Sequence, residues 1–220
     1  MELVIERKFR GPTESANGGY TCGVLASFLH GPTEVTLRRP PPLERPLEVA
    51  TEGALELRDG HEVVAEAAQA ELDLEVPEPI SFDRAAEAAL PEGDKESVFP
   101  ECFVCGWARE DGLRIFAGPV DEDLVAATWI PRDDAISSEF VWAALDCPGA
   151  YAVHFGARGN PVLGRLTARV EHLPHAGERC VVMGWPFGEE GRKLYAGTAL
   201  YGEDGRVLGS ARATWIIPKP

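Results

Sequence analysis

The longest apolar run of the chain lies between Ser138 and Phe155. It is too long for an ordinary strand and leaves no polar stripe, which predicts a helix that is buried on nearly all sides. One carboxylate, Asp146, lies inside this run. An ionised side chain in such a place is costly unless it is paired, hydrogen-bonded or used in chemistry. Asp146 is therefore the first candidate functional residue.

Four runs with strand character follow the apolar run, between Leu163 and Ile217. Turn signals separate them, among them Glu189-Glu190-Gly191 and Glu203-Asp204-Gly205. This pattern predicts a sheet that wraps around the buried helix.

The first third of the chain repeats this order of elements. Its predicted elements are a strand at 3–9, a short helix at 20–29 after polar caps and glycines, a strand at 34–39, and a long hairpin formed by 47–58 and 61–76 around the turn Asp59-Gly60. A second copy of the pattern aligns 3–9 with 124–130 and 60–68 with 191–199. Because strand, helix and hairpin recur in one order, we predict two copies of a single strand-helix-sheet unit.

The predicted units comprise residues 1–76 and 101–220, and a linker at 77–100 joins them. The linker is rich in Glu, Ala and Pro, and residues 82–90 predict a short helix within it.

Composition and charge exclude two classes of partner. The 220 residues are 45% hydrophobic and 26% charged, as in a globular protein, and carry a net charge of -15. Phosphate contacts need clustered Lys and Arg, so this charge argues against nucleic-acid binding. The start of the chain alternates apolar and charged residues, and no later run reaches about 18 apolar residues. We expect a cytoplasmic protein that does not enter a membrane.

The five cysteines predict free thiols, because an odd number without a secretion signal argues against a disulfide framework. Cys102 and Cys105 have the spacing of half a zinc site, but no second such pair follows. His172 and His175 are the further ligands considered, and they fall in a strand-like run and in the turn after it. The interpretation is a buried pair of thiols, with no metal site and no cofactor.

Three short motifs follow one another along the chain in an order that is typical of a known family. The first helix begins with Gly18-Gly19-Tyr20, the strand after it ends in an Arg-Arg-Pro sequence at residues 38–40, and the second helix contains Ala144-Leu145-Asp146. Together with the hairpins, these motifs resemble the hotdog fold, specifically the double-hotdog acyl-CoA thioesterase-like proteins. The likeness covers roughly 1–76 and 113–217. The segment from Cys102 to Phe116 also resembles the entry strand of single-unit hotdog thioesterases.

The resemblance implies an α+β tandem hotdog, in which each unit has a central helix wrapped by a curved antiparallel sheet. It places acyl thioester sites where the units meet and makes Asp146 the acid-base residue. The amides of Gly18, Gly19 and Tyr20, after Asn17 at the helix start, would bind the substrate and hold an oxyanion.

Four cations are candidates for binding the phosphates of coenzyme A: Arg38, Arg39, Arg192 and Lys193. The alternative is that they are solvated charges at strand ends. Since Leu25 occupies the position equivalent to Asp146, and Glu139-Phe140 replaces Gly18-Gly19, we expect one competent site per chain.

Two departures from the family pattern keep alternatives open. The last strand has Ala213-Thr214-Trp215 where the best-known members place a glutamine, and Thr214 or Thr167 would have to supply the supporting hydroxyl. Asp146 could also simply cap a helical turn that begins near Pro148.

Three functions remain from the sequence. The first is hydrolysis of an acyl thioester by Asp-assisted attack of water. The second is a non-catalytic hotdog protein that binds an acyl thioester or another apolar ligand. The last is a hydratase, which would need a histidine near the acid, and His154 is poorly spaced for that role. Exposed sheet edges make a homo-oligomer possible.

Overall fold

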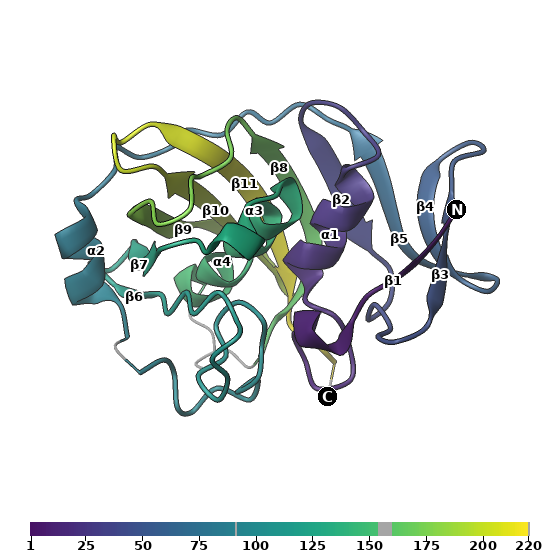
Figure 1. Ribbon diagram of the computed structural model, residues 1–220, viewed down its shortest axis with the longest axis horizontal. Coiled ribbons are helices and arrows are strands. Elements are labelled where there is room, and N and C mark those ends of the chain that lie inside the picture. The colour runs from purple at the N-terminus through teal and green to yellow at the C-terminus, as the bar shows by residue number, and fades with distance from the viewer. Residues whose placement is uncertain (91, 154–159, 220) are drawn as a thin grey trace.

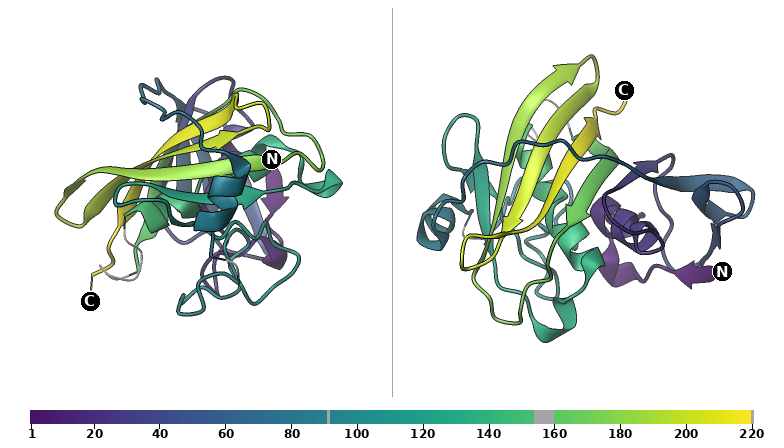
Figure 2. Two further views of the ribbon diagram at one scale, coloured as in Figure 1. Left: turned by 90° about the vertical axis from the view of Figure 1, so that its left-hand side faces the viewer. Right: turned by 90° about the horizontal axis from the view of Figure 1, so that it is seen from above.

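The computed structural model describes residues 1–90, 92–153 and 160–219. The described chain forms an antiparallel sheet of 11 strands, with the helices α1 (Gly18–Ala26), α3 (Ser138–Ala144) and α4 (Cys147–Ala152) packed on one face (Figure 1). Turned views show the twist of the strands and the helices on one side of them (Figure 2). The main apolar core lies between this sheet face and the helices.

The first half of the sheet comes from the first 69 residues. Its elements are β1 (Glu2–Val4), a 3-10 turn (Arg7–Phe9), α1 (Gly18–Ala26), β2 (Thr33–Leu37), β3 (Pro46–Ala50), β4 (Leu55–Asp59) and β5 (Glu62–Gln69). Asn17 caps α1 through its side chain, as the polar start of this helix predicts.

The second half carries longer strands. Its elements are α2 (Phe82–Ala88), β6 (Gly118–Pro119), β7 (Val125–Trp129), a 3-10 turn (Asp133–Ala135), α3 (Ser138–Ala144), α4 (Cys147–Ala152), β8 (Val162–Val170), β9 (Cys180–Glu190), β10 (Lys193–Tyr201) and β11 (Val207–Ile216). The four strand runs expected after the apolar helix are thus present. After β5 the chain crosses to α2, which packs against β7 and β9 (Figure 1).

The two halves join through an antiparallel pairing of β2 with β8, in which Thr33 lies opposite Ala168 and Thr36 opposite Arg165. Counted outward from this junction, the strand order is β2-β5-β4-β3-β1 on one side and β8-β11-β10-β9-β7-β6 on the other. Apart from the short edge strand β6, the same order of strands therefore occurs twice within one continuous sheet.

Three predicted strands differ from the observed ones. The strand expected at 3–9 ends at Val4, because the next residues turn and bury Phe9, whose ring stacks on Tyr20 with 3.9 Å between centroids. The strand expected at 47–58 divides into β3 and β4 around Gly53, which has a φ of 100°. The partner strand β5 ends at Gln69 rather than at 76.

The helix expected between Ser138 and Phe155 is also divided. α3 ends at Ala144 and α4 begins at Cys147, so that Asp146 lies at the junction. Pro148 explains the break, because a proline ring clashes with the carbonyl four residues earlier, here that of Ala144, but fits the first turn of a new helix. The residues after Val153, up to 159, lie outside the described part of the chain.

The segment expected to be an entry strand, Cys102 to Phe116, contains turns and irregular backbone instead. The amide of Gly106 donates to the carbonyl of Cys102 at 2.8 Å and folds the segment back on itself. A side chain at 106 would lie 2.4 Å from that carbonyl oxygen, so glycine is required there. The segment is nevertheless largely buried.

Close approach of α1 and α3 depends on two further glycines. A Cβ atom at Gly19 would lie 2.5 Å from the Cβ of Asp146, and one at Gly23 would lie 2.8 Å from the Cα of Glu139. Glycine at both positions lets the helix of the first half contact the helix pair of the second half without intervening side chains. The start of α1 thereby reaches the junction that carries Asp146.

In the described residues, no helix has both the length and the apolar character needed to cross a bilayer.

Candidate active site

Asp146 is buried between the two halves of the chain, with 2% of its surface exposed. Its Oδ2 atom accepts a hydrogen bond from the Nδ2 atom of Asn17 at 2.8 Å and another from the amide of Gly19 at 2.9 Å. Although Asp146 occupies the N-cap position of α4, its side chain makes no capping hydrogen bond. The capping alternative is therefore wrong, because the carboxylate is turned toward the other half of the protein.

The second carboxylate oxygen of Asp146 is not paired. Oδ1 is buried and has no hydrogen-bond partner among the described residues. Burial raises the pKa of Asp146 to about 7, although the hydrogen bonds from Gly19 and Asn17 act in the opposite direction. An unpaired buried oxygen costs free energy, and a bound water, a ligand or a chemical role can offset that cost.

Asn17 holds the carboxylate and the helix start at the same time. While its Nδ2 atom donates to Asp146, its Oδ1 atom accepts from the amide of Tyr20 at 2.8 Å. The side chain is 3% exposed. Asn17 was expected to bind substrate, and in the structure both ends of its amide group are hydrogen-bonded within the protein.

Replacement of Asn17 separates these two contacts. Asn17→Ser keeps a good N-cap and removes the donor to Asp146, whereas Asn17→Ala removes both. We expect the free energy of unfolding of both variants to fall by about 1.5–3 kcal/mol, because the hydrogen bond to the buried acid is missing. That of the alanine variant should fall by about 1 kcal/mol more, because the cap is also missing. Urea unfolding of both variants measures the difference. Equal stabilities would show that the cap contributes nothing.

The three backbone amides expected to hold an oxyanion differ in their hydrogen-bond partners. The Gly19 amide donates to Asp146 and the Tyr20 amide to Asn17, so both are already hydrogen-bonded. The Tyr20 ring packs in an aromatic cluster with Phe9, Phe103 and Phe140. The Gly18 amide, at the first position of α1, has no acceptor among the described residues. Of the three, it is the amide that remains for a substrate oxygen.

A cavity of about 660 Å³ opens beside these groups. The first half contributes Asn17, Gly18 and Leu37 to its wall, and the second half contributes Asp146, Leu163, Trp215 and other mainly apolar residues. A cavity of this size and character suits a small organic ligand with an apolar part. The wall thus combines an apolar surface with one buried carboxylate.

The structure places the candidate cations in two groups. Arg38 and Arg39 line the cavity, where they pair with Glu66 and Glu62 at 2.7 Å each. Arg192 and Lys193 are not among the described residues that line it, and Arg192 donates to the backbone carbonyl of Ile217 at 2.8 Å. The cavity therefore has two of the four expected cations at its wall.

The hydroxyl group beside the acid comes from a residue that the sequence analysis missed. Thr198 on β10 is fully buried and donates to the carbonyl of Leu145, the residue before Asp146, at 2.8 Å. Thr167 donates instead to Glu34 at 3.2 Å, and Thr214 is not among the described residues that line the cavity. No sequence motif marked Thr198, although its strand was predicted. His154, which a hydratase would require, lies outside the described residues.

A second missed group is a cluster of three thiols in the cavity wall. Cys147 follows Asp146 directly and lies beside Cys102 and Cys105. The two cysteines of the Cys-x-x-Cys segment are buried, as expected.

No family model and no curated protein matches this chain. Several solved structures do match this chain. A protein from Novosphingobium aromaticivorans, provisionally classed as a thioesterase, matches with a TM-score of 0.65 at 13% identity, over 99% of this chain and 95% of its own. The tesB protein of Mycobacterium avium subspecies paratuberculosis matches with a TM-score of 0.60 at 13% identity, over 93% and 88%.

A third match is a conserved hotdog protein of unknown function from Alicyclobacillus acidocaldarius. Its TM-score is 0.60 at 11% identity, and the match covers 100% of this chain and 93% of that protein. Such low identities establish the fold alone. The resemblance found in the sequence is thus confirmed at the level of architecture: this chain has an α+β hotdog fold.

Proposed function

We propose that this protein hydrolyses acyl thioesters in the cavity between its two halves, with Asp146 as the proton acceptor. The observation that carries the proposal is a buried carboxylate in the wall of an apolar cavity, one oxygen of which has no hydrogen-bond partner in the described part of the chain. Its other oxygen is fixed by Asn17 and Gly19 from the opposite half. A carboxylate that is held on one side and open on the other suits general base catalysis.

The expected reaction needs few groups. Water attacks the carbonyl carbon of the thioester while Oδ1 of Asp146 takes its proton. The amide of Gly18 stabilises the negative charge that develops on the carbonyl oxygen. The carbon-sulfur bond then breaks, and the leaving thiolate receives the proton from Asp146. The acyl group would lie along the apolar wall near Leu163 and Trp215.

We further propose that the two halves are tandem hotdog units, at residues 1–76 and 101–220. The repeated strand order on either side of the β2–β8 junction supports this division. The position that corresponds to Asp146 in the first unit is Leu25, which is fully buried and cannot accept a proton. One competent site per chain follows from this asymmetry.

Coenzyme A is the proposed carrier of the acyl group. The chain carries a net charge of -15, so an anionic carrier needs local positive charge at the cavity. Arg38 and Arg39 supply it at the cavity wall. Their pairing with exposed glutamates is weak and can give way to a phosphate.

Substitution of these arginines tests the carrier. Arg38→Ala combined with Arg39→Ala is expected to raise KM for an acyl-CoA about tenfold, equivalent to about 1.4 kcal/mol, and to leave kcat nearly unchanged. The same acyl group on the neutral thiol N-acetylcysteamine should show no such change. Arg192→Ala is the matched control, because Arg192 lies outside the described cavity wall. An equal rise in KM for both carriers would contradict binding of coenzyme A by Arg38 and Arg39.

The proposal as a whole is tested by release of free thiol from a panel of short, medium, long and aromatic acyl-CoA substrates. Turnover above the rate without protein is expected for at least one class. Calorimetry with a non-hydrolysable thioether analogue of each substrate measures binding separately. Binding without turnover on any substrate would overturn hydrolysis and favour the alternative, a hotdog protein that binds an acyl thioester.

A further inference from the structure

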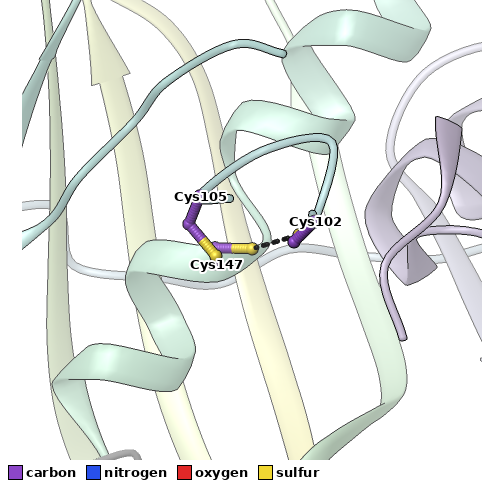
Figure 3. A group of neighbouring side chains, drawn as sticks. All are labelled: Cys102, Cys105 and Cys147. Carbon is purple, nitrogen blue, oxygen red and sulfur yellow. Dashed lines mark hydrogen bonds between the residues drawn. The ribbon is translucent and has the colours of Figure 1, made fainter. Parts of the chain in front are cut away.

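Three thiols converge on one point in the cavity wall. Cys102 and Cys105 come from the irregular segment before β6, and Cys147 comes from the start of α4 (Figure 3). The sulfur atoms of Cys102 and Cys147 lie 3.7 Å apart, and all three sulfurs lie within 4.8 Å of one another. All three residues are buried and none forms a disulfide. The function proposed above does not use them.

We propose that Cys102, Cys105 and Cys147 bind one zinc ion whose fourth coordination position faces the cavity. Zinc binds cysteine sulfur at about 2.3 Å in a tetrahedron, which sets neighbouring sulfurs about 3.8 Å apart. The Cys102–Cys147 separation already has this value. The widest separation in the cluster exceeds it by no more than about 1 Å, which side-chain rotation can remove.

The surroundings of Cys102 favour a metal-bound thiolate. The side-chain amide of Asn17 donates toward its sulfur, with the Nδ2 atom 3.9 Å away. Amides that point at a ligating atom orient it and stabilise its negative charge. The amide of Gly106 donates to the carbonyl of Cys102 at 2.8 Å, and this return of the backbone lets Cys105 lie beside Cys102.

The position of the three cysteines indicates a structural role for the zinc ion. The segment from Cys102 to Phe116 has no regular strand or helix, yet much of it is buried. A metal shared with Cys147 would tie this segment to α4, next to Asp146. A water molecule on the fourth position is also the kind of donor that Oδ1 of Asp146 lacks among the described residues.

In the sequence, the spacing of Cys102 and Cys105 indicates only half of a zinc site. A zinc site was rejected there because neither a second Cys-x-x-Cys pair nor suitably spaced histidines follow Cys102 and Cys105. In the described residues, His172 and His175 are not part of the cluster. The third ligand is a single cysteine at the start of α4, which the fold brings to the pair.

Zinc uptake by the purified chain tests the proposal, and thioester hydrolysis is not needed as a readout. Reduced, chelator-washed protein is mixed with Zn²⁺, freed of excess metal and analysed for bound zinc. We expect one zinc ion per chain, release of a proton for each thiol that ionises, and a rise in the thermal midpoint of about 5 °C or more. With Co²⁺ in place of Zn²⁺, we expect the sulfur-to-metal charge-transfer band and the visible bands of a tetrahedral thiolate site.

Alanine variants locate the ligands. Cys102→Ala, Cys105→Ala and Cys147→Ala should each lower the affinity for Zn²⁺ at least about tenfold. Cys180→Ala is the matched control, since Cys180 is a buried thiol on β9 outside the cluster, and it should bind zinc like the parent. The far-ultraviolet circular dichroism of each variant reports whether it has folded.

The parent protein alone can overturn the proposal even if a variant fails to fold. Absence of stoichiometric zinc, or a cobalt complex without the charge-transfer band, would do so. A disulfide between two of the three cysteines in protein purified without reductant, together with no metal uptake after reduction, would show a redox pair instead. Neither result would bear on hydrolysis, which is measured separately.

Discussion

Asp146→Asn is expected to lower kcat for acyl-CoA hydrolysis about 100-fold or more, the contribution that a positioned proton acceptor supplies. The substitution keeps the shape of the side chain, but an amide cannot take a proton from water. Asp146 is buried and its Oδ2 atom is held by Asn17 and Gly19, so a neighbouring side chain has little room to replace it. Steady-state kinetics on the best substrate of the panel measures the loss.

The control is Asp73→Asn, which removes a carboxylate from an exposed position between β5 and α2. It should hydrolyse the substrate at the parent rate. Binding of a thioether analogue should be nearly the same for the parent and for Asp146→Asn, because the proton acceptor acts on the transition state. Equal kcat values for Asp146→Asn and the parent would remove Asp146 from the mechanism.

Gly19→Ala is expected to lower the free energy of unfolding by about 2–3 kcal/mol and to reduce activity as well. The added methyl group would lie 2.5 Å from the Cβ of Asp146 and 2.7 Å from the carbonyl oxygen of Trp142. Since the second contact is with backbone, the helices have to separate. That movement lengthens the hydrogen bond from the Gly19 amide to Asp146. Urea unfolding and steady-state kinetics measure the two effects.

Gly149→Ala is the matched substitution within a helix. Its methyl group would meet Trp215 and Thr198 side-chain atoms at 3.0 and 3.3 Å, which small adjustments can relieve. Alanine also has a helix propensity about 1 kcal/mol better than glycine, so we expect a change in stability of less than about 1 kcal/mol. If Gly149→Ala destabilised the protein as much as Gly19→Ala, the close approach of α1 to Asp146 would not be the cause.

The pattern of apolar and polar residues predicted most of the elements, because strands and amphipathic helices depend on local periodicity. The four long strands of the second half were found where the sequence placed them, and the short helix expected at 82–90 is observed as α2 at Phe82–Ala88. The helix expected at 20–29, after polar caps and two glycines, is α1, which already begins at Gly18 and ends at Ala26. The break at Pro148 was also visible in the sequence, although the apolar run around it predicted one continuous helix.

Contacts between distant segments could not be predicted in the same way. The sequence identified Asp146 from the cost of burying a charge, but not the atoms that hold it, which are 127 and 129 positions away along the chain. It assigned the amides of Gly19 and Tyr20 to a substrate, whereas the folded chain uses them for Asp146 and Asn17. Thr198 carried no motif, and Cys147 was not connected with Cys102 and Cys105.

The sequence by itself determined a sheet packed on a buried helix, the repeated order of elements and the identity of the buried acid, because each depends on the polarity and spacing of neighbouring residues. Only the tertiary structure decided which groups surround that acid. Pairing of β2 with β8 and the glycine contact between α1 and α3 join the halves, and so bring Asn17, Gly19 and the three cysteines to Asp146. Such convergence depends on long-range packing, which no local pattern encodes.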